Sequence, residues 1–151
     1  METELRGFVI DLTASLQQQP ELGGHRIELR SAREVRAEID PTLLAQALQS
    51  IVLNAAQAMG DRPGEVHLTL CEEEDRILLD VEDDGPGIAP EVLPLIFQPF
   101  FTTKTRGTGL GLSIARRNVE SLGGTIDVTT ELGRGTRFRL AFPRKECPRR
   151  R

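Results

Sequence analysis

The segment RILLDVEDDGPGI, residues 76–88, runs from an alternating apolar pattern directly into a glycine-rich turn. Ile77, Leu79 and Val81 share one parity and predict a β-strand with one buried face. Asp83 has the same parity, so strict alternation turns its carboxylate toward the apolar side, where an unpartnered charge is costly. Either the strand has ended and Asp83 only begins the turn, or this carboxylate is an acceptor for a donor on a ligand.

A second alternating run precedes this strand and predicts its hairpin partner. Val66, Leu68 and Leu70 alternate with less apolar residues, and the acidic turn 72–75 separates the two runs. The same pattern returns twice near the C-terminus, on either side of a turn at 132–135. Further strands are therefore expected within residues 25–30, 34–37, 126–128 and 138–142.

Three segments have apolar residues spaced three and four positions apart, the pattern of a helix with one buried side. The first ends before Pro20, the second begins at Asp40-Pro41, and the third stops at Gly123-Gly124, all established helix boundary signals. The expected ranges are 5–16, 41–59 and 110–122. Three helices with about five or six strands predict an α/β (α+β) two-layer sandwich, a sheet covered by helices on one face.

Residues 84–108 have no steady period and contain many Gly and Pro residues. A long irregular segment inside a small domain usually has a function. This one carries an exposed-looking aromatic group, Phe97, Phe100 and Phe101, for which ordinary core packing is the alternative role.

The second expected helix, 41–59, carries a polar residue beside its apolar stripe. Asn54 lies on the flank of its apolar stripe, and Ser50 and Gln57 share that flank at about 100° per residue. Asparagine is a poor helix former in the interior of a helix. The Asn54 side chain either is solvated or offers its carbonyl oxygen to a hard cation such as Mg²⁺.

Closely spaced glycines at 107–111 lead directly into the third expected helix. Unobstructed backbone amides and the positive end of a helix dipole favour an anionic group such as phosphate. Lys104, just before them, adds a movable cation. The alternative is a flexible loop with a tight helix–sheet contact and no ligand.

The composition narrows the class of protein further. A length of 151 residues and a formal net charge of −4 suit one soluble domain and argue against nucleic-acid binding. No apolar stretch could span a bilayer and no secretory signal is present, so we expect a cytoplasmic location and no membrane contact by this domain. Cys71 and Cys147 are expected to be free thiols. The expected domain covers 1–143, and a basic flexible tail covers 144–151.

The order of these motifs resembles the catalytic ATP-binding domain of a bacterial sensor histidine kinase, within the gyrase, histidine kinase and MutL ATPase superfamily. Asn54 corresponds to the asparagine box, and residues 83–88 to the first glycine box. Residues 97–104 correspond to the phenylalanine box, and 107–112 to the second glycine box. Four motifs in the family's order are far more specific than one glycine pattern. The short lid is most similar to the nitrogen-regulator-type branch.

This resemblance implies a Bergerat-type fold, with a mixed, mostly antiparallel sheet of about five strands, three helices on one face, and a lid between about 89 and 106 anchored by the phenylalanines. It also implies ATP and Mg²⁺ as cofactors. Asp83 would accept a hydrogen bond from the adenine amino group, Gly87 would let the backbone approach the ring, and Asn54 would carry the Mg²⁺ that bridges the phosphates. Asn54 and Lys104 are the implied catalytic residues. The implied nucleotide-binding set is Asn54, Asp83, Gly85, Gly87, Ile88, Thr103, Lys104, Gly107, Thr108, Gly109, Leu110, Gly111, Leu112 and Thr136.

In the family that this chain resembles, the γ-phosphoryl group of ATP moves to a histidine on dimerisation helices, for relay to a response regulator. His25 precedes an expected strand and His67 lies within one, so neither fits the context of an acceptor. The acceptor helices are therefore expected upstream of Met1 or in a partner protein. The isolated chain is expected to be a monomer.

Some residues depart from the family's pattern. Ser50 stands where many sensor kinases have asparagine and gyrase- and MutL-type ATPases have a catalytic glutamate, so rapid ATP hydrolysis by this domain alone is not expected. Gln57 and Ala58 replace a lysine and an aromatic residue found in many kinases, which bears on ATP affinity.

Two other functions share the same ATP motifs. One is an anti-sigma-type serine kinase, which phosphorylates a separate protein. The other is a non-catalytic module that binds nucleotide only to change partners. The Gly-Leu-Gly-Leu run at 109–112 favours the histidine kinase over the first, and the retention of the motif residues disfavours the second.

Overall fold

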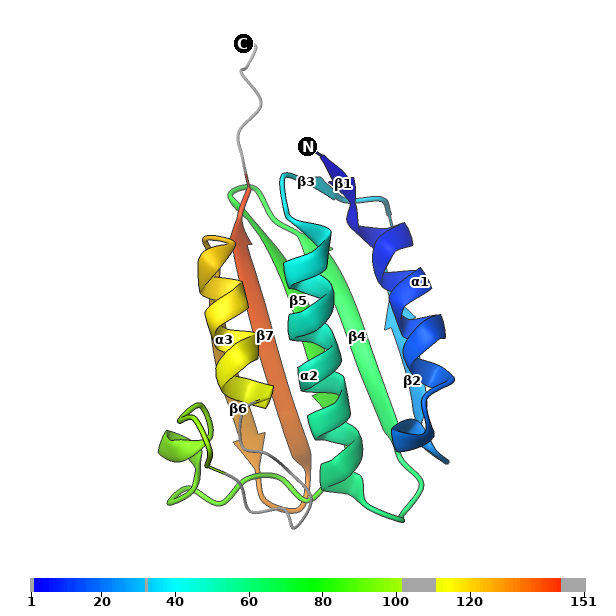
Figure 1. Ribbon diagram of the computed structural model, residues 1–151, viewed down its shortest axis with the longest axis vertical. Helices are drawn as coiled ribbons and strands as arrows, with labels where there is room; N and C mark the ends of the chain where they lie inside the picture. Colours follow the sequence, from blue (N-terminus) through cyan, green and yellow to red (C-terminus); the bar gives the residue numbers. More distant parts are fainter. Residues whose placement is uncertain (1, 32, 102–110, 145–151) are drawn as a thin grey trace.

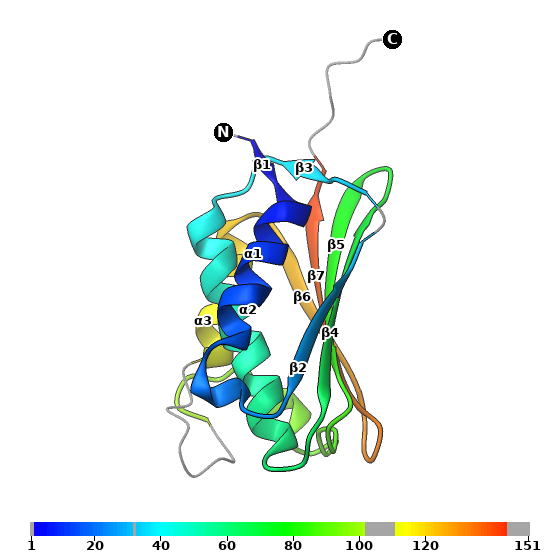
Figure 2. The same ribbon diagram turned by 90° about the vertical axis from the view of Figure 1, so that its right-hand side faces the viewer.

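The computed structural model describes residues 2–31, 33–101 and 111–144. Its helices and strands form two layers, and Figure 2 shows the three α-helices on one side of the main sheet. In chain order the elements are β1 (Thr3–Glu4), α1 (Leu5–Gln17), η1 (Pro20–Leu22), β2 (Arg26–Arg30), β3 (Arg36–Ala37), α2 (Pro41–Met59), β4 (Glu65–Glu72), β5 (Arg76–Asp83), η2 (Leu93–Leu95), α3 (Gly111–Ser121), β6 (Thr125–Glu131) and β7 (Gly135–Pro143).

The main sheet has five strands in the order β2-β4-β5-β7-β6 (Figure 1). The β2 and β4 strands are parallel, and the other three pairings are antiparallel. The predicted two-layer sandwich with a mixed, mostly antiparallel sheet of about five strands is therefore confirmed. The helix ranges differ from the predicted ones by at most one residue at each described end.

One predicted strand is shorter than expected and lies outside the main sheet. The segment expected at 34–37 contains only the two-residue β3, which pairs with β1 in a separate small sheet. The Glu4 carboxylate explains this position, because it accepts a hydrogen bond from the Val35 backbone N–H while it caps the start of α1. This contact holds the segment near the first turn of α1, away from the edge of the main sheet.

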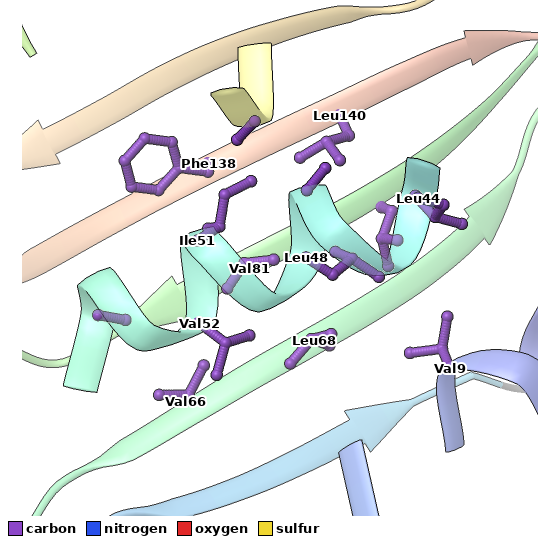
Figure 3. Packing of buried hydrophobic residues seen from close by; sticks show 14 of the residues in the cluster. Val9, Leu44, Leu48, Ile51, Val52, Val66, Leu68, Val81, Phe138 and Leu140 are labelled. Carbon is purple, nitrogen blue, oxygen red and sulfur yellow. The ribbon is translucent and has the colours of Figure 1, made fainter. Parts of the chain in front are cut away.

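The hydrophobic core lies between the helices and the sheet, with α2 at its centre. Figure 3 shows four side chains of α2, Leu44, Leu48, Ile51 and Val52, among apolar side chains of α1, β4, β5 and β7. All four are fully buried. Burial of an aliphatic side chain of this size contributes about 1.5–3 kcal/mol before the cost of ordering, so this stripe fixes α2 firmly on the sheet.

The other face of the sheet carries polar side chains. Asp80 and Arg139 lie opposite each other on β5 and β7 and form two hydrogen bonds of 2.9 Å. This pairing raises the pKa of the Arg139 guanidinium above its usual value, mainly through the hydrogen bonds to Asp80. The expected free thiol of Cys71 is confirmed, and Cys147 lies outside the described residues.

Two searches of the described residues give negative results. None of the helices in these ranges is both long and apolar enough to cross a membrane. Within the same ranges, no group of three or more His, Cys, Asp or Glu side chains is placed to hold a metal ion.

Candidate functional site

The described motif residues gather at one end of the sandwich, the lower end in Figure 1. The C-terminal half of α2, the first turn of α3 and the β6–β7 turn all lie there. The antiparallel pairing of β5 with β7 brings the end of β5 to the same place, because Asp83 lies opposite Thr136. The topology thus assembles residues that are far apart in the sequence.

Asp83 is the last residue of β5, and its side chain lies on the face that the helices cover. Its two cross-strand partners are Val66 and Thr136, both buried, and residues opposite each other in a sheet share a face. Its Oδ1 atom also accepts a hydrogen bond of 2.9 Å from the Gly85 backbone N–H. Asp83 therefore starts the turn, and its carboxylate also faces the helix-covered side of the sheet, so the two interpretations of the sequence are compatible.

Gly85 is confined between this carboxylate and α2. A Cβ atom at position 85 would lie 2.9 Å from Asp83 Oδ1 and 3.3 Å from Met59 Cγ. Any larger residue would therefore displace the Asp83 carboxylate or the last side chain of α2. Gly85 allows the first glycine motif to lie directly against the end of that helix.

Position 87 requires glycine for a different structural reason. Its φ is +81°, a conformation that L-residues with a side chain rarely adopt, and a Cβ atom there would collide with the Glu131 carbonyl oxygen at the end of β6. Contact with the sheet alone thus accounts for this glycine. The role suggested by the family, close approach to an adenine ring, stays a prediction.

Two threonine hydroxyls connect the glycine motif to the β6–β7 hairpin. The buried Thr136 lies opposite Thr130, and their hydroxyl oxygens are 3.0 Å apart. Thr130 Oγ1 also accepts a hydrogen bond of 2.9 Å from the Ile88 backbone N–H. Sequence reasoning missed Thr130, although its parity with the apolar Ile126 and Val128 could have placed it on the covered face.

Asn54 and Ser50 lie one turn apart on the same side of α2, as predicted, and both are partly buried. Asn54 takes part in an interaction within the structure. Gln57, expected on the same flank, is exposed. The first residue of α3 approaches α2 here, because a Cβ atom built on Gly111 would lie 3.9 Å from Ser50 Cβ.

Asn118 fixes the position of α3 on α2 and was not singled out from the sequence. Its side chain is buried, and Nδ2 donates to the Leu43 carbonyl at 3.3 Å and to Gln46 Oε1 at 3.0 Å. A buried amide with partners on another helix resists sliding of the two helices. A polar residue beside Ala115 and Val119 in the apolar stripe was the available signal.

The three phenylalanines do not act as one group. The Phe97 ring packs edge-on against Phe138, with 6.3 Å between ring centroids, and the Arg116 guanidinium lies 5.2 Å from the centroid of the Phe97 ring. Phe97 therefore anchors the segment to the core. Phe100 is 75% exposed and has a φ of +67°, so the expectation of an exposed ring holds for Phe100 and the alternative of core packing does not.

Several predicted residues lie outside the described part of the chain, namely Thr103, Lys104, Gly107, Thr108, Gly109 and Leu110. Gly111 and Leu112 are described and form the start of α3.

The class of this chain follows from fold, site and comparison together. The family model for histidine kinase-, DNA gyrase B- and HSP90-like ATPases matches residues 39–146, and the chain belongs to this family. Within the family it is similar to sensor histidine kinases. The sensor histidine kinase ZraS of Escherichia coli strain K12 is 43% identical over 120 residues, which are 78% of this chain and 26% of that protein. Sporulation kinase A of Bacillus subtilis strain 168 is 34% identical over 144 residues, 93% of this chain and 23% of that protein.

The matched chain corresponds to only part of each relative. It spans about a quarter of the length of these two kinases. The sensory histidine kinase/phosphatase NtrB of Rhizobium leguminosarum is 38% identical over 115 residues, 66% of this chain and 30% of that protein. Of these two relatives, ZraS shares the higher sequence identity with this chain.

Solved structures agree with the sequence comparisons. The nucleotide-free catalytic domain of histidine kinase ThkA superimposes with a TM-score of 0.84 and 32% identity, covering 95% of both chains. The mycobacterial sensor histidine kinase MprB, at 22% identity, has the same fold with a TM-score of 0.82, over 97% of this chain and 100% of that chain. The predicted histidine-kinase-type ATP-binding fold is confirmed.

Proposed function

We propose that the end of the sandwich formed by Asp83, Asn54 and the start of α3 binds Mg·ATP, and that this domain transfers the γ-phosphoryl group to a histidine on dimerisation helices of a parent kinase. The observation that carries the proposal is the Asp83 carboxylate. It lies on the helix-covered face of the sheet, at the end of β5 where the C-terminal half of α2 and the start of α3 also lie, and an acceptor oxygen in that place suits a donor on a bound ligand.

The adenine end of the proposed site is formed by the first glycine motif and β7. The exocyclic amino group of adenine is a hydrogen-bond donor that fits the Asp83 carboxylate. The Gly85 N–H donates to that carboxylate, Thr136 lies opposite Asp83 on β7, and the Thr130 hydroxyl holds the Ile88 backbone on β6. We assign Gly87 to this end as well, as the residue that holds the turn against β6.

The phosphate end of the proposed site lies where α3 begins. Backbone N–H groups at the first turn of a helix have no intrahelical partner and favour anionic oxygens. Gly111 is exposed at that turn and lies beside Ser50, and Ser50 is one helical turn from Asn54 on α2. The residues proposed to complete this end, with Leu112, are Thr103, Lys104, Gly107, Thr108, Gly109 and Leu110.

The chain's own residues would mostly position groups and neutralise charge. The Asn54 amide oxygen is a hard ligand suited to Mg²⁺, which supplies charge stabilisation on the phosphates when it is bound. Lys104 would add a mobile positive charge. Ser50 has no carboxylate to activate water, which favours transfer to an acceptor over hydrolysis.

We place the acceptor histidine outside this chain. His25 is buried, and its Nε2 lies 2.8 Å from the Gly60 carbonyl, so that nitrogen donates to the backbone. His67 lies on the polar face of the sheet between Glu28 and Glu65, away from the helix-covered side. We propose a response regulator as the next partner, because ThkA is known in complex with the response regulator protein TrrA. A monomeric, cytoplasmic domain without nucleic-acid or membrane contact suits this function.

Substitution of Asp83 by asparagine tests the ATP site. It keeps the shape but exchanges an acceptor oxygen for a donor facing the adenine amino group, so ATP affinity should fall by roughly 10- to 100-fold. Calorimetric titration with Mg·ATP measures the change, and thermal unfolding checks the fold. The matched control is Asp11→Asn at an exposed position on α1, which should bind like the wild type. Unchanged affinity in Asp83→Asn would contradict the adenine role.

A second experiment separates the histidine kinase from the serine kinase. The domain is mixed with Mg·ATP labelled on the γ-phosphate and with the dimerisation helices of its parent protein. An acid-labile, base-stable product supports a phosphohistidine. An acid-stable phosphoester indicates a serine kinase, and absence of product with intact ATP binding indicates a non-catalytic module.

A further inference from the structure

The hydroxyl of Thr130 lies at a junction between the first glycine motif and the β6–β7 hairpin. It accepts a hydrogen bond from the Ile88 backbone N–H at 2.9 Å, donates to the Gly135 carbonyl at 3.1 Å, and lies 3.0 Å from the Thr136 hydroxyl. Three neighbours thus meet at one side-chain oxygen on the helix-covered face of β6.

The chemistry of a hydroxyl group fixes the direction of these hydrogen bonds. A hydroxyl has one proton to donate and two lone pairs to accept with. The Ile88 N–H can only donate and the Gly135 carbonyl can only accept, so the Thr130 proton goes to Gly135. All three contacts then hold only if Thr136 donates to Thr130. The oxygen of Thr136 then keeps its lone pairs and is available as an acceptor.

Two backbone contacts reinforce the same junction. The Gly133 N–H donates to the Pro86 carbonyl at 2.8 Å, and the Gly87 backbone lies directly against the Glu131 carbonyl. Three consecutive residues, 86–88, are therefore held on the β6–β7 hairpin. Thr130 supplies the side-chain part of this attachment.

We propose that Thr130 is a positioning residue for nucleotide recognition: its hydroxyl fixes the Ile88 backbone and orients the Thr136 hydroxyl as an acceptor at the adenine end of the site. This proposal rests on the proposed ATP site. Thr130 acts through Ile88 and Thr136 and need not touch the nucleotide. Its specific effect is on discrimination between purines, because a fixed acceptor set distinguishes the amino group of adenine from the carbonyl of hypoxanthine.

The test compares three variants of the full chain. Thr130→Val keeps the shape but leaves the Ile88 N–H and the Thr136 hydroxyl without their partner, and Thr130→Ser restores the hydroxyl. Thr129→Val, at the exposed neighbouring position on the opposite face, is the matched control. Calorimetry gives the affinities for ATP and for inosine triphosphate in the presence of Mg²⁺.

We expect Thr130→Val to lose about tenfold in ATP affinity and most of the preference for ATP over inosine triphosphate. Such a loss corresponds to the free energy that about one hydrogen bond contributes when a buried donor loses its acceptor. Thr130→Ser and Thr129→Val should keep both within about twofold. A Thr130→Val variant that retains the wild-type ATP preference would overturn the proposal. Equal losses in Thr130→Ser and Thr130→Val would also overturn it, because the hydroxyl would then be irrelevant.

A nucleotide-free measurement keeps this result distinct from failure of the ATP site itself. Hydrogen exchange of the Ile88 amide should be about tenfold or more faster in Thr130→Val than in the wild type, and slow in Thr130→Ser. Unchanged exchange in Thr130→Val contradicts the attachment. A wild-type protein with no preference for ATP over inosine triphosphate would contradict the proposed function. The exchange rate of the Ile88 amide would still decide whether Thr130 fixes the first glycine motif.

Discussion

Ser50 on α2 lies directly beside the backbone of Gly111, the first residue of α3. A Cβ atom built on Gly111 would stand 3.9 Å from Ser50 Cβ, an ordinary van der Waals distance, and would meet no closer atom among the described residues. The packing of the described residues therefore leaves room for a methyl group at position 111. Gly111 differs in this from Gly85 and Gly87, where a Cβ atom would come too close to neighbouring atoms.

Gly111→Ala should separate stability from nucleotide binding. Alanine is the better helix former by up to about 1 kcal/mol, so the free energy of unfolding should stay equal or rise slightly. The added methyl group would stand where the proposed phosphate chain approaches the helix amides, so ATP affinity should fall by about tenfold or more. Denaturant unfolding and calorimetry with Mg·ATP measure the two effects.

The matched control for this variant is Gly24→Ala. A Cβ atom at position 24 has no neighbour within 4 Å, and the residue lies far along the chain from the ATP motifs. Both ATP binding and stability should stay close to the wild type. If Gly111→Ala binds ATP as well as Gly24→Ala does, the start of α3 is not the phosphate end.

Asn54→Ala tests the proposed metal role. Loss of an oxygen ligand should weaken ATP binding in the presence of Mg²⁺ while affecting adenosine binding little, because adenosine carries no phosphates to bridge. Calorimetry with both ligands measures the difference, and Gln49→Ala, exposed on the same helix, is the control. Equal losses for ATP and adenosine would assign Asn54 to the general shape of the site and not to the metal.

Gly87→Ala should destabilise the protein by about 2–4 kcal/mol, because it combines a positive φ with a collision against the Glu131 carbonyl. Gly133→Ala separates the cost of the positive φ from the cost of the collision. Gly133 has a φ of +83° but no neighbour within 4 Å of its Cβ position, so its cost should be only the backbone term of about 1 kcal/mol. Chemical denaturation measures both. Similar losses in the two variants would mean that the contact with β6 contributes nothing.

The sequence predicted the elements that local periodicity controls. The alternation of Ile77, Leu79 and Val81 predicted β5, and the same parity placed Asp83 on the helix-covered face. The Asp40-Pro41 signal gave the start of α2, where the Asp40 side chain accepts a hydrogen bond from the Thr42 N–H. Such signals act within a few residues and survive in almost any tertiary context.

Long-range contacts could not be predicted in the same way. Nothing near Thr130 in the sequence shows that its hydroxyl meets Ile88, 42 residues away, or that Asn118 bonds Leu43 across 75 positions. Phe100 and Phe97 are only three residues apart, yet one is exposed and the other packs on Phe138, because the backbone turns between them. The motif residues were thus identified through family resemblance, whereas the residues that hold them became visible only in the structure.

The last prediction concerns Glu4, whose carboxylate connects the start of α1 to the β3 segment. Its oxygens accept hydrogen bonds from the backbone N–H groups of Gly7, Arg6 and Val35 at 2.8, 2.9 and 3.2 Å. Burial acts to raise the pKa of this carboxyl, but the three hydrogen bonds and the nearby Arg36 outweigh it and lower the pKa below its ordinary 4.5. A group with a lowered folded-state pKa stabilises the protein above its unfolded-state pKa, and this contribution is lost as the pH falls through the folded-state value.

Glu4→Gln should therefore cost about 1 kcal/mol of unfolding free energy at neutral pH, a value limited by partial solvent exposure, and the cost should shrink as the pH falls below about 4.5. Urea unfolding of the wild type and the variant between neutral pH and pH of about 3 measures this difference. Glu2→Gln, at an exposed position two residues earlier, should show no such trend. A Glu4→Gln cost that stays constant across this range would show that the carboxylate charge is not what stabilises the start of α1, since only protonation of that charge removes its contribution at low pH.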